Sequence, residues 1–118
     1  MKIDSTQFGS IIIDGEGYDH DVVIRLSGAV KKRKKKLSKR LFGTSHTVSA
    51  DEARHVYEDG SETLIIGTGQ YGALELSQEA EAFLREKGCA VIAAPTPQAI
   101  ERFNQTRGRK IGLFHVTC

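Results

Sequence analysis

The sequence has no long apolar run, and this absence excludes a membrane-spanning helix. Its aliphatic triplets Ile11–Ile13 and Leu64–Ile66 have the length of short strands, whereas a helix needs roughly 18 to 20 apolar residues to cross a bilayer. The first residues also lack the apolar core of a secretory signal and the arginine-rich pattern of a transit segment. We therefore expect a cytoplasmic protein with no membrane partner.

Cysteine is scarce as well, which argues against a disulfide framework. The two cysteines, Cys89 in an apparent buried strand and Cys118 at the last position, have no spacing typical of disulfide-rich domains, and we interpret both as free thiols. The 118 residues, 39% hydrophobic and 27% charged, have the size and composition of one soluble domain spanning 1–118. The chain is too short for a two-domain dehydrogenase, a kinase or a barrel of eight βα units.

Basic charge is concentrated in one segment. The formal net charge is +2, but residues 31–40 hold eight of the seventeen basic side chains and no acid, which leaves nine bases against fifteen acids elsewhere. The rest of the chain therefore has a net charge of −6 (9 − 15), unlike the overall basicity of most nucleic-acid-binding domains. We call the cationic residues of this segment the basic strip: Lys31, Lys32, Arg33, Lys34, Lys35, Lys36, Lys39 and Arg40.

The basic strip has two interpretations. Its side chains can neutralise the phosphates of a nucleic acid, or they can form a solvated edge whose lysines resist aggregation. Only Phe42 lies nearby to stack on a base, and no helix-turn-helix, zinc-finger or RNA-binding motif accompanies the strip. The sequence therefore favours a partner protein over nucleic acid.

In the first half of the chain, the pattern predicts an opening β-hairpin. Residues 8–13 and 18–26 have strand character and are joined by the turn residues 14–17. The polar segment that follows, residues 30–42, suits an exposed strand or a loop, and the pattern does not decide between them.

In the second half, helix and strand signals alternate. Ser49 and Glu52 form a capping box, Ser77 caps a later helix, and Thr96 followed by proline begins another. The predicted helices are 50–57, 78–87 and 97–106, and the predicted strands are 63–66, 89–94 and 111–116. From residue 63 this is a βαβαβ order, which predicts three mainly parallel strands covered by helices, with the N-terminal hairpin extending or flanking the sheet.

A glycine-rich loop follows the strand at 63–66. It matches the pattern G-x-G-x-x-G of dinucleotide-binding proteins, but the helix signal at Ser77 comes five residues after the last glycine and the expected later acid is absent. We therefore predict no cofactor. Two interpretations remain, a strand exit that needs glycine for positive φ and a set of backbone amides that holds a small anion. The candidate anion-binding residues are Gly67, Thr68, Gly69, Gln70 and Gly72.

A second candidate site is a polar cluster of His46, His115 and Cys118, because imidazole and thiolate groups bind metals and imidazole can activate a thiol. On a strand, however, the spacing of the last two sends their side chains to opposite faces, and no fixed metal-binding spacing is present. The alternative is that His46 orders a loop and the C-terminal tail docks. We assign His20 and its two acidic neighbours to a solvated strand face and His55 to a helix surface, and we predict no metal and no catalytic residue.

Four motifs together resemble one known family. They are Gly43-Thr44-Ser45-His46, Leu64-Ile65-Ile66-Gly67-Thr68-Gly69, Thr96-x-x-Ala99-Ile100-x-x-Phe103-Asn104 and His115-Val116-Thr117-Cys118. In this order they resemble the Mth-nine-three-eight-like family of domains of unknown function, from Phe8 to the end of the chain. The resemblance implies a single three-layer α/β domain with a central mixed sheet, and it brings no catalytic residues. Eukaryotic relatives include a mitochondrial complex I assembly factor and a cytoplasmic protein linked to adipocyte differentiation.

Three functional hypotheses follow from these observations. The first is a non-enzymatic binding or protein-interaction module, in keeping with the assembly role that the resemblance implies. The second is a small-molecule or anion-binding protein, with or without an enzymatic activity, that uses the glycine loop 67–72. The third is nucleic-acid binding through the basic strip. The sequence indicates neither an oligomeric state nor a reaction.

Overall fold

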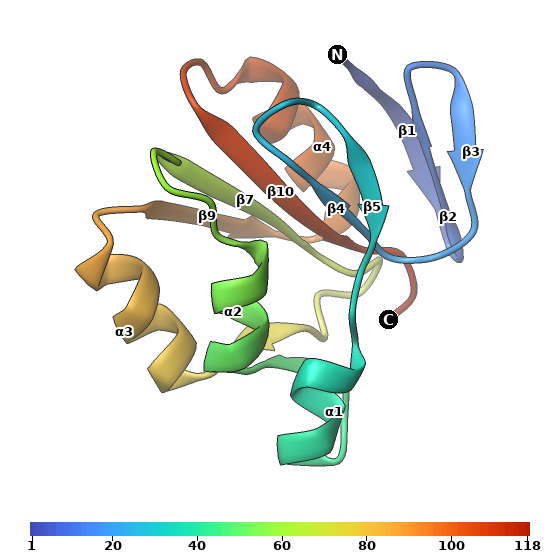
Figure 1. The fold of residues 1–118 in the computed structure, drawn as a ribbon. Coiled ribbons are helices and arrows are strands. Elements are labelled where there is room, and N and C mark those ends of the chain that lie inside the picture. Colours follow the sequence, from blue (N-terminus) through green and yellow to red (C-terminus); the bar gives the residue numbers. More distant parts are fainter.

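The computed structural model describes residues 1–118 and is built around a five-stranded mixed sheet with the strand order β5-β4-β10-β7-β9 (Figure 1). Its strands are β4 (Val22–Ile24), β5 (Val30–Lys32), β7 (Thr63–Thr68), β9 (Ala90–Ala94) and β10 (Lys110–His115). The β7, β9 and β10 strands run parallel to one another, and β4 pairs antiparallel with both β10 and β5. This arrangement confirms the predicted mixed sheet and its parallel C-terminal half.

Two layers cover the central sheet, which confirms a three-layer α/β domain. Helices α2 (Ala50–Val56) and α3 (Gln78–Glu86) pack on one face, and α4 (Thr96–Gln105) packs on the other. Alternate residues of the central strands point to opposite faces of the sheet. Leu64 and Ile66 lie in the hydrophobic core under α2 and α3, whereas Ile65 lies in the core under α4. A strand covered on both sides is apolar throughout, which explains the continuous run in β7.

The N-terminal strands form a separate three-stranded sheet, β1-β2-β3, beside α4. Its strands are β1 (Ile3–Gln7), β2 (Ser10–Ile13) and β3 (Glu16–Tyr18). The predicted hairpin turn is present between β2 and β3, but the second strand ends at Tyr18 and residues 22–24 belong to the central sheet instead. The side chain of Asn104 on α4 exchanges two hydrogen bonds, of 2.9 and 2.8 Å, with the main chain of Ile3. These bonds attach β1, which the pattern did not predict, to the second helical layer.

Residues 30–42 are neither wholly strand nor loop. The edge strand β5 is followed by a short helix, α1 (Lys36–Phe42), which we did not predict. It has no side-chain cap at its N-terminus and ends at Gly43, where a φ of +72° lets the amide of that residue return to the carbonyl oxygen of Lys39.

Ser49 and Ser77 cap their helices as predicted, whereas the prediction that Thr96 caps the third helix is wrong. The hydroxyl of Ser49 accepts a hydrogen bond from the Glu52 amide in α2, and that of Ser77 accepts one from the Ala80 amide in α3. In α4, the residue before the helix is Pro95, and Thr96 lies inside the first turn with its hydroxyl used elsewhere. Two short parallel strands, β6 (Thr47–Val48) and β8 (Glu75–Leu76), complete the structure. None of the four helices has the length and apolarity that crossing a membrane requires.

Candidate functional site

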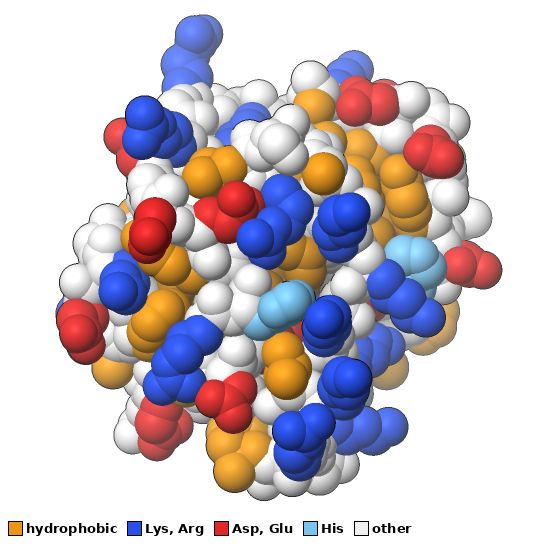
Figure 2. Space-filling model, viewed as in Figure 1, with side chains coloured by type: hydrophobic (Ala, Val, Ile, Leu, Met, Phe, Trp, Pro, Cys, Tyr) orange, Lys and Arg blue, Asp and Glu red, His pale blue; other side chains and the backbone are white.

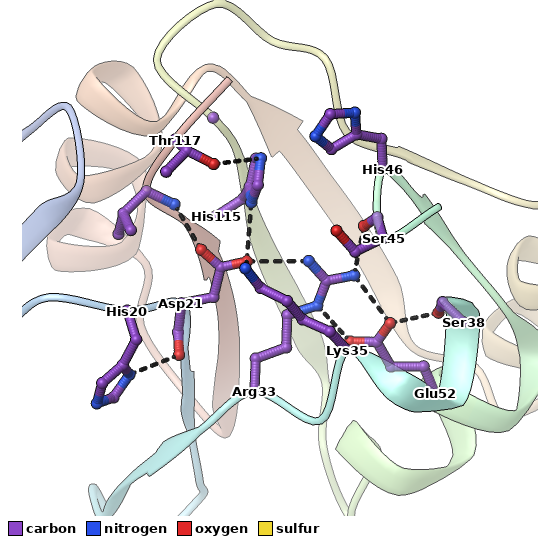
Figure 3. A network of polar contacts seen from close by, with 12 residues as sticks. His20, Asp21, Arg33, Lys35, Ser38, Ser45, His46, Glu52, His115 and Thr117 are labelled. Atoms are coloured by element: carbon purple, nitrogen blue, oxygen red, sulfur yellow. Dashed lines mark hydrogen bonds and ion pairs between the residues drawn. The ribbon is translucent and has the colours of Figure 1, made fainter. Parts of the chain in front are cut away.

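A buried polar network lies where β5, α1, α2 and the end of β10 meet, and Arg33 is at its centre (Figure 3). Although its sequence neighbours are exposed, Arg33 is only 4% exposed. Its guanidinium donates to both carboxylate oxygens of Glu52, over 2.6 and 3.0 Å, and to Asp21 over 2.9 Å. A further N–H donates to the carbonyl oxygen of Ser45 over 2.7 Å. The assignment of Arg33 to an exposed basic strip is therefore wrong, because its guanidinium is buried and paired with the carboxylates of Glu52 and Asp21.

Asp21 connects this guanidinium to the end of β10. One of its oxygens accepts a hydrogen bond from Nδ1 of His115 over 2.8 Å, and the other accepts one from the Val116 amide over 2.9 Å. Because the carboxylate is ionised and only accepts, Nδ1 carries the imidazole proton, and Nε2 is left facing the Thr117 hydroxyl at 3.3 Å. Asp21 is 1% exposed, so its assignment to a solvated strand face is corrected.

The remaining carboxylate, Glu52, is held by the first turns of α1 and α2. The hydroxyl of Ser38 donates to it, and the same hydroxyl accepts a hydrogen bond of 2.9 Å from the Ser49 amide. Ser49 in turn donates to the carbonyl oxygen of Leu37 over 2.9 Å. The sequence identified Glu52 only as a member of a capping box with Ser49. In the structure its carboxylate binds the buried guanidinium instead, because the Ser49 amide donates to Ser38.

The network holds one buried cation and two buried anions. The ammonium of Lys35, itself partly exposed, lies 3.8 Å from Asp21 and offsets the excess negative charge from the surface. Each buried polar side chain of the network has a hydrogen-bond partner, and the one buried side-chain atom of the protein without a partner, Oγ of Ser61, is not part of it. Because every hydrogen-bonding side chain of the network has a partner, we interpret the network as structural: it fixes the junction of β5, α1, α2 and the end of β10.

The line from Asp21 through His115 to Thr117 has the order carboxylate, imidazole, hydroxyl that activates nucleophiles in hydrolases. In this protein the imidazole is enclosed, since His115 is 1% exposed and the ring of His46 packs edge-on against it with 5.3 Å between the ring centres. Of the three residues of the candidate polar cluster, His46 and His115 therefore lie side by side. Cys118 differs, because it is exposed and accepts hydrogen bonds through its main-chain oxygen. The chain contains no group of three or more histidine, cysteine or acidic residues placed to hold a metal ion.

The glycine loop binds the C-terminal tail of the same chain. The amides of Tyr71 and Ala73 donate to the main-chain oxygen of Cys118 over 3.0 and 3.1 Å, and the amide of Gln70 donates to the carbonyl oxygen of Thr117 over 2.7 Å. The amide of Gly69 donates to Oγ1 of Thr96 over 2.9 Å.

An external anion would have to displace the tail, so anion binding by this loop stays a prediction. Positive φ angles of +102° at Gly69 and +74° at Gly72 are what the strand-exit interpretation requires.

The electrostatics of the network predict acid sensitivity. Burial by itself raises the pKa of Asp21, but hydrogen bonds from His115 and the Val116 amide, together with the Arg33 guanidinium, lower it to about 2 from 3.8. A carboxyl group whose pKa is lower in the folded than in the unfolded protein stabilises the folded state at every pH above its unfolded-state pKa. This contribution is lost as the pH falls through the folded-state pKa. We expect this group to contribute about 2.5 kcal/mol at pH 6, lost between about pH 5 and pH 1. Urea unfolding as a function of pH measures the loss, and the NMR titration of the Asp21 carboxyl carbon measures its source. A carboxyl midpoint near 4 would contradict the prediction.

The other seven residues of the basic strip are exposed, and three of them, Lys31, Lys32 and Lys34, line a concave surface of about 490 Å3 on the central sheet. The remaining lining residues are Val23, Arg25 and His55. We call the exposed strip residues together with Arg25 and His55 the basic face; Figure 2 shows lysine and arginine side chains gathered over this part of the molecule. Burial together with the neighbouring Lys34 and Arg25 lowers the pKa of His55, as a positive local potential requires.

An apolar notch adjoins the basic face at α1. Its volume is about 360 Å3. Leu41 and Phe42 of α1 and Ala50 of α2 form its apolar lining, and Asp51, Arg54 and Glu79 form the charged remainder. Leu41 is 67% exposed and Phe42 is 39% exposed, so α1 presents large apolar side chains beside its own cations.

Comparison with known proteins gives a consistent family assignment. The model of a family described as a protein of unknown function, DUF498/DUF598, matches residues 3–114. The crystal structure of the conserved hypothetical protein PH1505 from Pyrococcus horikoshii OT3 is 36% identical, covers 100% of both chains and superimposes with a TM-score of 0.93. A protein named MT938 is 33% identical over 99% of this chain and 98% of its own, with a TM-score of 0.86. A protein from Bordetella parapertussis, 18% identical over 98% of this chain and 94% of its own, shares the fold with a TM-score of 0.72.

Proposed function

The chain belongs to the DUF498/DUF598 family of unknown function, and we propose that it is a non-enzymatic binding module that docks an acidic segment of a partner protein on its basic face. The observation that carries the proposal is the segregation of cations on one concave face of an otherwise acidic domain. The buried network supports it, because the side chains of Asp21, Arg33 and His115 are buried and hydrogen-bonded to one another.

The cations of the groove are available to a partner. None of Lys31, Lys32 and Lys34 takes part in the six ion pairs of the chain. Arg25 is paired with Glu58, so its charge is largely balanced within the protein. Three unpaired ammonium groups on one concave surface attract carboxylates from solution and raise the rate of encounter with an acidic partner.

Two features favour a protein over a nucleic acid as the partner. The apolar notch beside Leu41 and Phe42 gives the basic face a place for a large apolar side chain, as the centre of a protein interface requires. The acidic remainder of the domain, with its net charge of −6, repels a long phosphate backbone but not a short acidic segment.

A photo-crosslinking residue placed at Lys39 tests the proposal in extract of the source cells. We expect one discrete protein adduct that resists nuclease and whose yield falls when salt rises from 0.1 to 0.5 M, because screening shortens the reach of the lysines to about 4 Å. The same residue placed at Glu101, exposed on α4, should give no such adduct.

Charge reversal provides the matched comparison. One variant reverses three residues of the basic strip: Lys31→Glu, Lys34→Glu and Lys36→Glu. Its control reverses three exposed residues elsewhere, with the same change of net charge: Lys2→Glu, Lys87→Glu and Arg107→Glu. The adduct at position 39 should disappear in the first variant and persist in the second. Loss in both variants, or removal of the adduct by nuclease, would refute a protein partner at this face.

A further inference from the structure

The two edges of the central sheet differ in how they are protected. The edge strand β5 carries Lys31 and Lys32, which discourage pairing with another strand. The opposite edge strand of the sheet is β9 (Figure 1). Its sequence is Ala-Val-Ile-Ala-Ala, without a charged residue. Val91 is 38% exposed there, and Ala90 and Ala93 are exposed as well. An apolar edge without such protection readily pairs with another strand.

The unpaired backbone groups of β9 can be assigned. The Ala90 amide donates to the carbonyl oxygen of Glu62 at the start of β7, so Ala90 and Ile92 direct their N–H and C=O groups toward β7. Because successive residues of a strand alternate between its two edges, Val91 and Ala93 direct theirs outward. Two donors and two acceptors at alternate positions therefore remain for an incoming strand.

A groove runs between β9 and α3 beside this edge. Its volume is about 550 Å3, and its lining includes Leu74, Val91 and Ala93. Two long charged side chains of α3, Glu81 and Arg85, also line it. They are four residues apart and lie on the same side of the helix.

We propose that β9 pairs antiparallel with β9 of a second copy of this chain about a twofold axis at Ile92, which joins the two central sheets into one. In this register Val91 lies opposite Ala93 of the partner subunit, and the two residues exchange both of their hydrogen bonds. The twofold axis repeats the exchange on its other side, so every outward-facing group of Val91 and Ala93 is paired. An isologous contact of this kind is closed and does not propagate into a fibre.

Charge complementarity on α3 selects a second copy over an unrelated strand. A twofold axis normal to the sheet sets the two α3 helices antiparallel on the same side, so that Glu81 of each faces Arg85 of the partner subunit. Glu81 and Arg85 also lie at about the same height along β9 as the twofold axis at Ile92. The chain reverses direction between α3 and β9, and the midpoint of Glu81 and Arg85 lies roughly 5 Å before the end of α3, whereas Ile92 lies roughly 7 Å after the start of β9. The pairing also closes the groove with the partner's α3.

Sedimentation equilibrium of the full chain tests the dimer. We expect a mass of twice 13.0 kDa at 100 μM, and the 13.0 kDa monomer for Val91→Lys, which introduces on β9 the kind of charge that protects β5. The matched control is Ser5→Lys, an exposed position of β1, which should remain dimeric. Circular dichroism checks that all variants fold. Amide exchange at Val91 and Ala93 should be slow in the wild-type protein and fast in Val91→Lys.

A charge swap makes the test specific for two copies. Glu81→Arg and Arg85→Glu should each weaken the dimer by roughly tenfold, because each places like charges opposite one another. The double variant Glu81→Arg/Arg85→Glu restores complementarity and should recover most of the loss. A wild-type protein that is monomeric at 100 μM would overturn the proposal, and that result would favour a strand from a different protein at this edge. A dimer that Val91→Lys leaves intact would overturn it too.

Discussion

Replacement of Arg33 with methionine is expected to destabilise the protein by about 3–5 kcal/mol, the cost of removing one partner from a buried ion network. The change leaves the carboxylates of Asp21 and Glu52 buried without their shared cation. Because a domain of this kind is stable by only about 5–15 kcal/mol, the loss should be evident in urea unfolding at pH 7. The loss should be smaller in acid, because a buried Glu52 without its cation favours the folded state once it is protonated, whereas Asp21 keeps its bonds from His115 and the Val116 amide.

The control for this variant is Lys34→Met, one residue away in the sequence but exposed. It should change the free energy of unfolding by no more than about 0.5 kcal/mol. Addition of Glu52→Gln to Arg33→Met should recover part of the stability, since it neutralises the carboxylate whose only ion-pair partner is Arg33. Equal effects of the methionine at positions 33 and 34 would mean that the guanidinium is not buried as described.

Replacement of Gly69 with alanine is expected to have the second large effect, about 2–5 kcal/mol, from strain at positive φ added to overpacking. A Cβ atom at Gly69 would lie 2.3 Å from the carbonyl carbon of Cys118 and 2.7 Å from the ring of His115, where φ is already +102°. The C-terminal tail must then move away from the loop. Hydrogen exchange should accelerate at the amides of Tyr71 and Ala73, which donate to that tail.

Gly72→Ala separates the two causes in the same loop. Its φ of +74° is also unfavourable for alanine, but the nearest atoms to a new Cβ are 3.7 and 3.8 Å away. We expect a loss of about 1 kcal/mol from the backbone alone, with exchange at Tyr71 and Ala73 unchanged. If Gly72→Ala were as damaging as Gly69→Ala, the close approach of the tail would not be the cause.

Most helices and strands could be predicted from the sequence because their signals are local. The capping residues Ser49 and Ser77 start their helices in the structure, and the apolar run of β7 lies in a sheet covered on both faces. The N-terminal strands were harder, since the local pattern of 18–26 does not show that the chain leaves one sheet at Tyr18 and enters another at Val22. That division is decided by which layer buries each segment.

The candidate site could be predicted only in part, because its contacts join residues far apart in the chain. His46 and His115 were identified by residue type, and they do lie together. Arg33 was hidden among seven other cations, with no local signal to distinguish it. Asp21 binds partners that are 12 and 94 residues away in the sequence. Its polar sequence neighbours therefore predicted a solvent-exposed side chain, whereas in the structure its carboxylate contacts a guanidinium and an imidazole.

The position of β10 has a consequence for how the protein is made. This strand lies between β4 and β7, yet residues 110–115 follow every other strand in the sequence. As the ribosome synthesises the chain, the β4–β5 hairpin and the β7–β9 pair emerge first and have no strand to join them. Sheet assembly should therefore wait until residues 110–115 have left the exit tunnel. Until then, β4 and β7 each expose an apolar edge, and nascent chains are most prone to associate with one another at this stage.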